Sequence, residues 1–211
     1  MRNSTAHAFP DFWSNLLLIR QGESTCNEAN RFAGSVDAPL PRLGRAQAQQ
    51  AAKTICGKIP DRLFVSNLSR ARETAEIVFP QAETGLAHEI DERLAERHFG
   101  EFTLRNKAEL QATHGIRGYE EALYDPEGVI RGAESFAEFQ HRVEQVLYEI
   151  TPLLKSGETV LVVAHKYVVE LMVRLILDLP LQSGYDLRLP NSKVLNAGEA
   201  PDLDFRRSLG R

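Results

Sequence analysis

Long hydrophobic runs are missing from this 211-residue sequence, and none approaches the roughly 20 residues that a membrane-spanning helix needs. An excess of positive charge is missing as well, since 29 acidic residues outnumber 25 lysines and arginines and give a net charge of −4. Neither a membrane nor a nucleic acid is therefore expected as a partner. The first 13 residues hold one arginine and no apolar stretch, so no secretion signal is expected there.

Cysteine is scarce: only Cys26 and Cys56 occur, far apart and outside any Cys-x-x-Cys or Cys/His cluster. This usage is typical of a reduced protein, although a disulfide between the two residues stays open. The six histidines show no metal-ligand spacing either. The sequence therefore predicts a cytoplasmic location, no metal and no other cofactor.

What the sequence does contain is enough apolar material for a full core, at 43% hydrophobic residues. No internal repeat, low-complexity tract or linker-like stretch divides it, so residues 1–211 are expected to form a single domain. Residues 1–13 are expected to be an N-terminal arm, which the aromatic side chains of Phe9, Phe12 and Trp13 attach to the body.

Short apolar segments predict buried strands, and amphipathic or alanine-rich segments predict helices between them. The expected strands cover residues 16–19, 60–65, 88–94 and 159–164. The expected helices cover about 43–56, 69–79, 136–150 and 168–177, with residues 66–69 capping the second helix and residues 185–195 extended. Such alternation predicts an α/β fold, a three-layer sandwich with a mostly parallel central sheet and helices on both faces.

Polar residues follow each predicted strand directly: Arg20 the first, residues 66–70 the second, Glu96 the third and His165 the fourth. Because ligands of such folds bind beyond the carboxyl ends of the strands, we expect these residues to meet on one rim. The segment from 103 to 129 mixes helical pieces with glycines and a proline. It is a candidate lid over that rim.

The segment after the first strand has the composition of a phosphate-binding loop. Arg20 offers a charged fork, Gly22 lets the backbone approach a ligand closely, and Ser24 and Asn27 add small hydrogen-bonding groups. Gln21 is the exception, because the residue best placed to attack phosphorus is an amide, which is not nucleophilic.

Eight motifs follow one another between residues 16 and 165: L-L-I-R-Q-G-E-S-x-x-N, R-F-A-G, D-A-P-L, L-G-R-A-Q-A, S-N-L-S-R-A-R-E-T-A-E-I, L-A-E-R-H-F-G, G-A-E-S and V-V-A-H. In this order they resemble the histidine phosphatase superfamily, and within it the phosphoglycerate mutase-like branch. The resemblance implies a phosphoglycerate mutase-like fold. It also implies a pocket in which two arginines and two histidines surround a phosphate group.

The resemblance implies a role for each matching residue. Arg20 and Arg70 match the arginines that grip the transferring phosphoryl group, and His165 matches the second histidine, a donor to the phosphoryl oxygens. Glu96 matches the acid that protonates the leaving oxygen and later activates water. Further substrate contacts are expected from Ser24, Asn27, Ala33 and Gly34.

One departure from the family affects the chemistry. The first family motif reads Arg-His-Gly, and its histidine becomes transiently phosphorylated, whereas this chain has Gln21 there. Binding can survive this change while turnover collapses. Two explanations stay open: a deliberate replacement that traps a ligand, or a natural pseudoenzyme that serves as a metabolite-binding or regulatory module. The intact remainder of the site suits the first, and Lys166, where the family commonly has glycine, suits the second.

A second departure concerns the substrate. Lys107 matches a substrate-binding lysine of the mutase branch, and with Lys166 it is expected to hold an anionic substrate tail. Mutases also carry an arginine pair where this chain has Glu120 and Glu121, which would repel a second phosphate or carboxylate. A phosphomonoesterase acting on a small phosphorylated metabolite is therefore favoured over a mutase. A second copy of the chain, in a homodimer, is kept as a further candidate partner.

Overall fold

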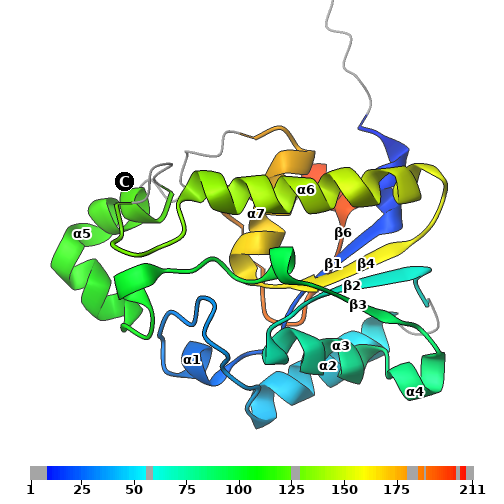
Figure 1. The fold of residues 1–211 in the computed structure, drawn as a ribbon, viewed down its shortest axis with the longest axis horizontal. Helices are drawn as coiled ribbons and strands as arrows, with labels where there is room; N and C mark the ends of the chain where they lie inside the picture. Colours follow the sequence, from blue (N-terminus) through cyan, green and yellow to red (C-terminus); the bar gives the residue numbers. More distant parts are fainter. Residues whose placement is uncertain are drawn as a thin grey trace, which may run out of the picture.

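The middle layer of the protein is a five-stranded sheet (Figure 1). The computed structural model describes residues 9–55, 59–124, 129–179, 185–187, 189–202 and 205–207. The strands of the sheet are β1 (Leu16–Arg20), β2 (Arg62–Ser66), β3 (His88–Asp91), β4 (Val160–Ala164) and β6 (Val194–Asn196). Their order is β3-β2-β4-β1-β6, in which the first four are mutually parallel and β6 runs antiparallel to β1.

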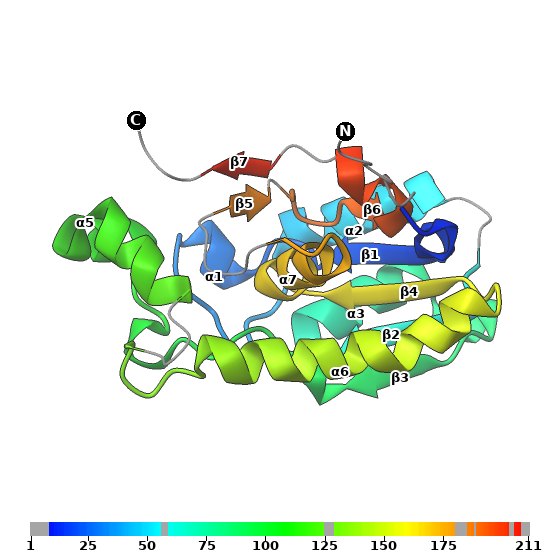
Figure 2. The same cartoon turned by 90° about the horizontal axis from the view of Figure 1, so that it is seen from above.

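Helices cover both faces of this sheet. On one face lie α6 (Phe136–Lys155) and α7 (Lys166–Ile176), and on the other lie α2 (Arg42–Ile55) and α3 (Ser69–Val78) (Figures 1 and 2). This arrangement confirms the predicted three-layer α/β sandwich with a mostly parallel sheet.

Strands β1 and β4 supply side chains to two separate cores. In β1, Leu16 and Leu18 join the apolar cluster beneath α6 and α7, whereas Ile19 joins the cluster beneath α2 and α3. Successive side chains of a strand point to opposite faces, so one strand serves both clusters. β4 is buried along its whole length, which explains its unbroken apolar sequence.

A third apolar cluster has no member in the central sheet. Its residues are Phe32, Phe99, Phe102, Leu110, Tyr119, Leu123 and Ile130. Three of them belong to α5 (Lys107–Tyr124), a helix that is interrupted at Gly115, where φ is 71° and ψ is 155°. This interrupted helix is the helical part of the segment predicted to be a lid.

The remaining elements are short. They are α1 (Thr25–Glu28), α4 (Gln81–Thr84), the paired strands β5 (Tyr185–Leu187) and β7 (Phe205–Arg207), and 3-10 turns at Asp11–Asn15, Glu92–Leu94, Gly100–Phe102 and Ala197–Asp202. Phe12 and Trp13 pack against the cluster beneath α6, while residues 1–8 of the predicted arm lie outside the described residues. Among the described helices, none has both the length and the apolar character that a membrane crossing requires.

Two local predictions need correction. The third strand ends at Asp91 and not at residue 94, because the Asp91 side chain accepts a hydrogen bond from the Arg93 amide (2.8 Å) and turns the chain. The start of α3 is not capped by residues 66–69 themselves, since no side chain there makes the capping bond. Instead, Asp37 accepts from the Ser69 amide at 2.8 Å.

Two further sequence predictions concern the cysteines and the C-terminal tail. Cys26 is a buried free thiol, and Cys56 lies outside the described residues. Within the tail that was predicted to be extended, residues 185–187 and 194–196 are strands. The intervening residues 190–193 form a turn in which Ser192 has a positive φ of 56°.

Candidate functional site

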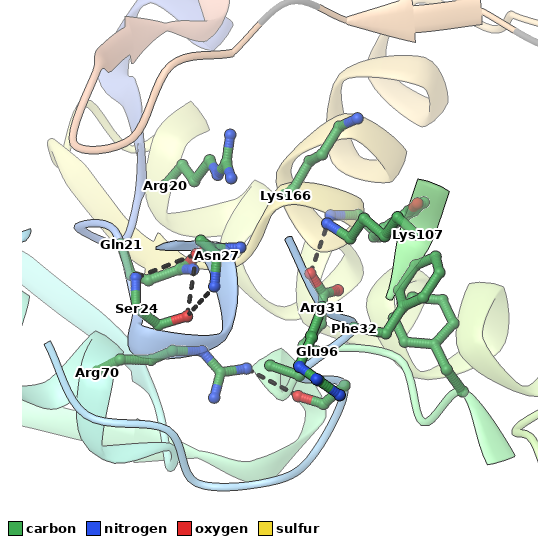
Figure 3. A pocket seen from close by; sticks show the side chains of 14 residues that line it. Arg20, Gln21, Ser24, Asn27, Arg31, Phe32, Arg70, Glu96, Lys107 and Lys166 are labelled. Carbon is green, nitrogen blue, oxygen red and sulfur yellow. Dashed lines mark hydrogen bonds between the residues drawn. The ribbon is translucent and has the colours of Figure 1, made fainter. Parts of the chain in front are cut away.

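A pocket opens at the carboxyl ends of the parallel strands, where this topology places ligand sites (Figure 3). Its cavity volume is about 40 Å³, which exceeds the space that one water molecule needs. Its lining residues are Arg20, Gln21, Ser24, Asn27, Arg31, Phe32, Ala33, Gly34, Arg70, Glu96, Phe99, Lys107, Lys166 and Tyr167. All predicted site residues except His165 therefore line this one pocket.

Three successive amides of the loop after β1 donate hydrogen bonds to other elements. The amides of residues 21, 22 and 23 donate, in that order, to the Ala164 carbonyl (2.8 Å), the Thr74 hydroxyl (3.0 Å) and the Gln47 side chain (2.8 Å). The Thr74 hydroxyl in turn donates to the Arg70 carbonyl at 2.6 Å. One threonine thus ties the loop to the helix that carries the second arginine.

Two glycines allow the loop to touch α2 backbone to backbone. A Cβ on Gly44 would collide with the carbonyl oxygen of Glu23, and a Cβ on Gly22 would collide with the carbonyl oxygen of Gly44. The close approach therefore requires glycine on both sides.

Ser24 and Asn27 hold each other in a capping box at the start of α1. The Ser24 hydroxyl accepts from the Asn27 amide (3.3 Å), while the Asn27 Oδ1 atom accepts from both the amide (3.1 Å) and the hydroxyl (3.0 Å) of Ser24. Because Oδ1 is occupied, Asn27 has its NH₂ group left to offer a ligand. A donor of that kind suits an anion.

The two arginines are positioned by carbonyl groups. Arg20 donates to the Leu189 carbonyl at 2.6 Å, and Arg70 donates to the carbonyls of Gly34 and Val36, both at 2.8 Å. Burial lowers the pKa of Arg70, against the opposing influence of Glu96 and Asp37. Arginine nevertheless stays protonated in proteins, so two fixed positive charges face the cavity.

Glu96 is the single carboxylate among the described residues that line the pocket. It accepts hydrogen bonds from the amides of Arg97 (3.1 Å) and Tyr167 (3.4 Å). Burial raises its pKa, and the nearby Arg70 only partly offsets this effect. A carboxyl group with a raised pKa can hold a proton and release it, which a general acid must do.

Gln21 lies directly after β1 and is 4% exposed. Its Oε1 atom is buried and has no hydrogen-bond partner among the described residues. The register of β1 and β4 pairs Arg20 with Ala164, so Gln21 and His165 are the next residues along these two neighbouring strands. Gln21 therefore lies next to His165 at the ends of the two central strands.

His165 differs from the other predicted site residues because it does not line the pocket. It is fully buried, and its Nε2 atom lies 2.7 Å from the hydroxyl oxygen of Ser66. Its Nδ1 atom has no hydrogen-bond partner among the described residues. Burial, with further contributions from Arg70, Arg142 and Arg20, holds the pKa of this imidazole well below its usual value.

The outer side of the pocket comes from the base of α5 and the start of α7. Lys107 places its Nζ atom 5.1 Å from the centre of the Phe32 ring, and Lys166 places its own 5.5 Å from the centre of the Tyr167 ring. Burial lowers the pKa of Lys107, and the positive charges of Lys166 and Arg20 lower it further. This mutual repulsion would be relieved by a bound anion.

Some lining residues were not predicted from the sequence. Arg31 and Phe32 belong to the R-F-A-G motif, of which only the last two residues were chosen, and Tyr167 follows the predicted Lys166 directly. The signal that could have identified them is their position in the sequence, directly beside predicted site residues. The side chains of Glu120 and Glu121 lie outside the described part of the structure. The argument against a mutase that rests on these two residues therefore stays a prediction from the sequence. The described residues contain no group of three His, Cys, Asp or Glu side chains that could hold a metal ion.

The fold and the pocket together indicate an α/β protein with a cationic ligand site at its strand ends. A family model described as the histidine phosphatase superfamily (branch 1) matches residues 16–199. The chain belongs to this superfamily, which confirms the resemblance that its motifs indicate.

Relatives of known name fall into two groups. The chain is 36% identical over 152 residues to a 2,3-bisphosphoglycerate-dependent phosphoglycerate mutase 2 of Gloeobacter violaceus, covering 71% of this chain and 69% of the relative. It is 32% identical over 206 residues to the corresponding mutase of Caulobacter vibrioides, covering 85% and 87%. Among solved structures, a mycobacterial glucosyl-3-phosphoglycerate phosphatase in complex with VO3 has a TM-score of 0.69 at 26% identity, covering 90% and 87%.

Proposed function

We propose that this protein binds the phosphate group of a small phosphorylated metabolite in the pocket and hydrolyses the ester slowly or not at all. The observation that carries the proposal is Gln21, an amide where the family resemblance implies the nucleophile, in a pocket that also contains Arg20, Arg70 and Glu96. Arg20, Arg70 and Asn27 would hold the phosphate oxygens. Glu96 would face the oxygen that bridges phosphorus and the rest of the metabolite.

The missing step is the first one. In the reaction that the family resemblance implies, a histidine nitrogen attacks phosphorus, the bond to the ester oxygen breaks, and an acid protonates that oxygen. The lone pair of an amide nitrogen is delocalised into the carbonyl group, and the amide oxygen is a weak nucleophile. No phosphoenzyme would therefore form at Gln21, while binding at the arginines would remain.

The names of the relatives include both mutases and phosphatases. Hydrolytic ancestry is supported by the acidic residues Glu120 and Glu121, which stand where mutases carry an arginine pair. Two carboxylates there would repel the second anionic group of a bisphosphoglycerate. A second candidate, a natural binding or regulatory module, is supported by Lys166, because it adds a cation to the pocket wall where the family commonly has glycine.

The test compares the protein with its Gln21→His variant on a panel of phosphate monoesters, with released inorganic phosphate as the readout. We expect the variant to exceed the unchanged protein by a factor on the order of 10³ or more, because loss of a nucleophile typically has at least that effect. A Gln50→His variant, changed at an exposed position of α2, is the matched control. Equal and measurable turnover by the unchanged protein and the Gln21→His variant would contradict the proposal. Activity in neither would favour the binding module.

A further inference from the structure

Ser66 and His165 form a buried pair at the ends of two neighbouring strands. Ser66 is the last residue of β2 and His165 follows β4, which lies beside β2 in the sheet. Both side chains are 0% exposed, and the Ser66 Oγ atom lies 2.7 Å from His165 Nε2. The resemblance assigns a role to His165 and none to Ser66.

Among the described residues, the hydroxyl group of Ser66 has one atom to which it can donate its proton, the Nε2 atom of His165. Its oxygen accepts a hydrogen bond from the Leu68 amide at 3.3 Å, and its other contact is the Nε2 atom of His165. If Nε2 carried the imidazole proton, two donors would point at one oxygen. The hydroxyl proton and the Nδ1 lone pair would then both be buried without a partner.

The opposite tautomer leaves fewer groups unsatisfied. With the proton on Nδ1, the Leu68 amide donates to Ser66 and the Ser66 hydroxyl donates to Nε2. Of the groups in this pair, the Nδ1–H group is then the one that has no partner among the described residues. Buried polar groups without partners destabilise a fold, so this tautomer is favoured.

The tautomer matters because the ring is neutral. Burial and the charges of Arg70, Arg142 and Arg20 hold the pKa of His165 well below its usual value. A neutral imidazole has one donor nitrogen and one acceptor nitrogen, so it can donate to an anion through only one of them.

We infer that Ser66 is a positioning residue, which fixes the proton of His165 on Nδ1. The donor role toward a phosphoryl oxygen that the family resemblance implies for His165 would then fall to this nitrogen. Without the Ser66 hydroxyl, the proton is free to move to Nε2, and Nδ1 would present a lone pair to the anion. The ligand in this statement rests on the proposed function, whereas the tautomer itself does not.

The tautomer can be read directly by NMR. In protein with ¹⁵N-labelled histidine, long-range correlations between ring protons and ring nitrogens separate a protonated from an unprotonated nitrogen. A His165→Gln variant identifies the His165 signals among those of the six histidines. We expect Nδ1 protonated and Nε2 unprotonated in the ligand-free protein near pH 7. A proton on Nε2 would overturn the inference.

The role of Ser66 is tested with Ser66→Ala, which removes the hydroxyl without adding bulk. We expect the His165 proton to move partly or wholly to Nε2, and the affinity for inorganic phosphate to fall about tenfold, as for the loss of a hydrogen bond to a charged group. A Ser156→Ala variant, changed at an exposed serine, should alter neither. An unchanged His165 tautomer in Ser66→Ala would overturn the inference.

The two proposals fail in different ways. If inorganic phosphate does not bind the unchanged protein, the proposed function fails, while the expected tautomer and its loss in Ser66→Ala would still support the positioning role. If Ser66→Ala does not fold, Ser66→Thr, which keeps a hydroxyl, should retain the Nδ1 proton. A proton on Nε2 in that variant would count against the inference.

Discussion

The two sides of the pocket are built very differently. The inner wall, formed by residues 20–24 with Thr74 and Arg70, is tied to the central sheet and to two helices by buried hydrogen bonds and glycine contacts. The outer wall takes Lys107 from the base of α5, and the segment that carries it, residues 103–124, packs in an apolar cluster with no member in the sheet. It joins the rest of the site through short backbone pairings with residues 30–32.

Glycines illustrate the difference. Gly44 on the inner side has no room for a methyl group, whereas a Cβ at Gly115 or Gly118 of α5 would meet nothing within 4 Å. The inner wall therefore tolerates little change and suits an invariant ligand group such as phosphate. The outer wall has space to vary, which suits the part of the ligand that differs between substrates.

The largest loss of binding is expected from Arg70→Ala on the inner wall. Removing this buried cation should weaken the binding of inorganic phosphate roughly 10- to 100-fold, because hydrogen bonds to charged groups contribute about 1.5–3 kcal/mol. Titration calorimetry measures the change. Arg72→Ala, on the exposed side of the same helix, is the control and should bind as before. Equal affinity in both variants would refute the assignment of Arg70 to phosphate.

A pair of glycine substitutions compares the two walls through stability. Gly44→Ala should destabilise the fold by about 1–3 kcal/mol, because the new methyl group collides with the Glu23 carbonyl. Gly118→Ala should be neutral or stabilising by up to about 1 kcal/mol, because alanine is the better helix former and the site is open. Denaturant melts report both values, and similar losses in the two variants would remove the contrast between the walls.

Glu96→Gln should reveal the raised pKa as a pH-dependent difference in melting temperature. Burial raises the pKa of Glu96, so its contribution to stability is fully present below the unfolded value of about 4.5 and is lost as the pH rises through the folded pKa. The amide does not titrate. The melting temperature of the variant relative to the unchanged protein should therefore rise by a few degrees between pH 4 and pH 8. If this difference in melting temperature instead falls between pH 4 and pH 8, the raised pKa of Glu96 is contradicted.

The smallest effect is expected from Lys107→Met on the outer wall. Binding of a phosphate ester with a carboxylate in its tail should weaken about threefold, since a partly solvated ion pair contributes up to about 1 kcal/mol. Binding of an ester with an uncharged tail should change less. Lys53→Met, at an exposed site of α2, is the control. Equal losses for both esters would mean that Lys107 does not distinguish the tails.

The sequence predicted the layers and ten of the residues that line the pocket because both follow from local patterns. Apolar periodicity identified the strands, and ordered motifs identified residues at the strand ends, such as Arg20 and Glu96. Asp37, which caps α3 from 32 positions away, and Phe32, which packs on Phe99, depend on contacts between distant segments. No local pattern encodes such contacts, which is why these features were missed.

His165 shows a different limit. Its motif predicted a site residue, but no local pattern indicated that its ring would be covered and bonded to Ser66. That bond depends on the order of β2 and β4 in the sheet, which places two residues 99 positions apart side by side. The proton position of a buried imidazole therefore had to be inferred from the fold.

The most direct test of binding without turnover is a ³¹P NMR titration of a phosphate monoester with the unchanged protein. We expect a saturable change in the shift or width of the ester signal, with no inorganic phosphate appearing over a period in which the Gln21→His variant consumes the ester. An ester signal that does not respond to the protein would contradict the binding site. Release of phosphate at the rate of the Gln21→His variant would contradict the role given to Gln21.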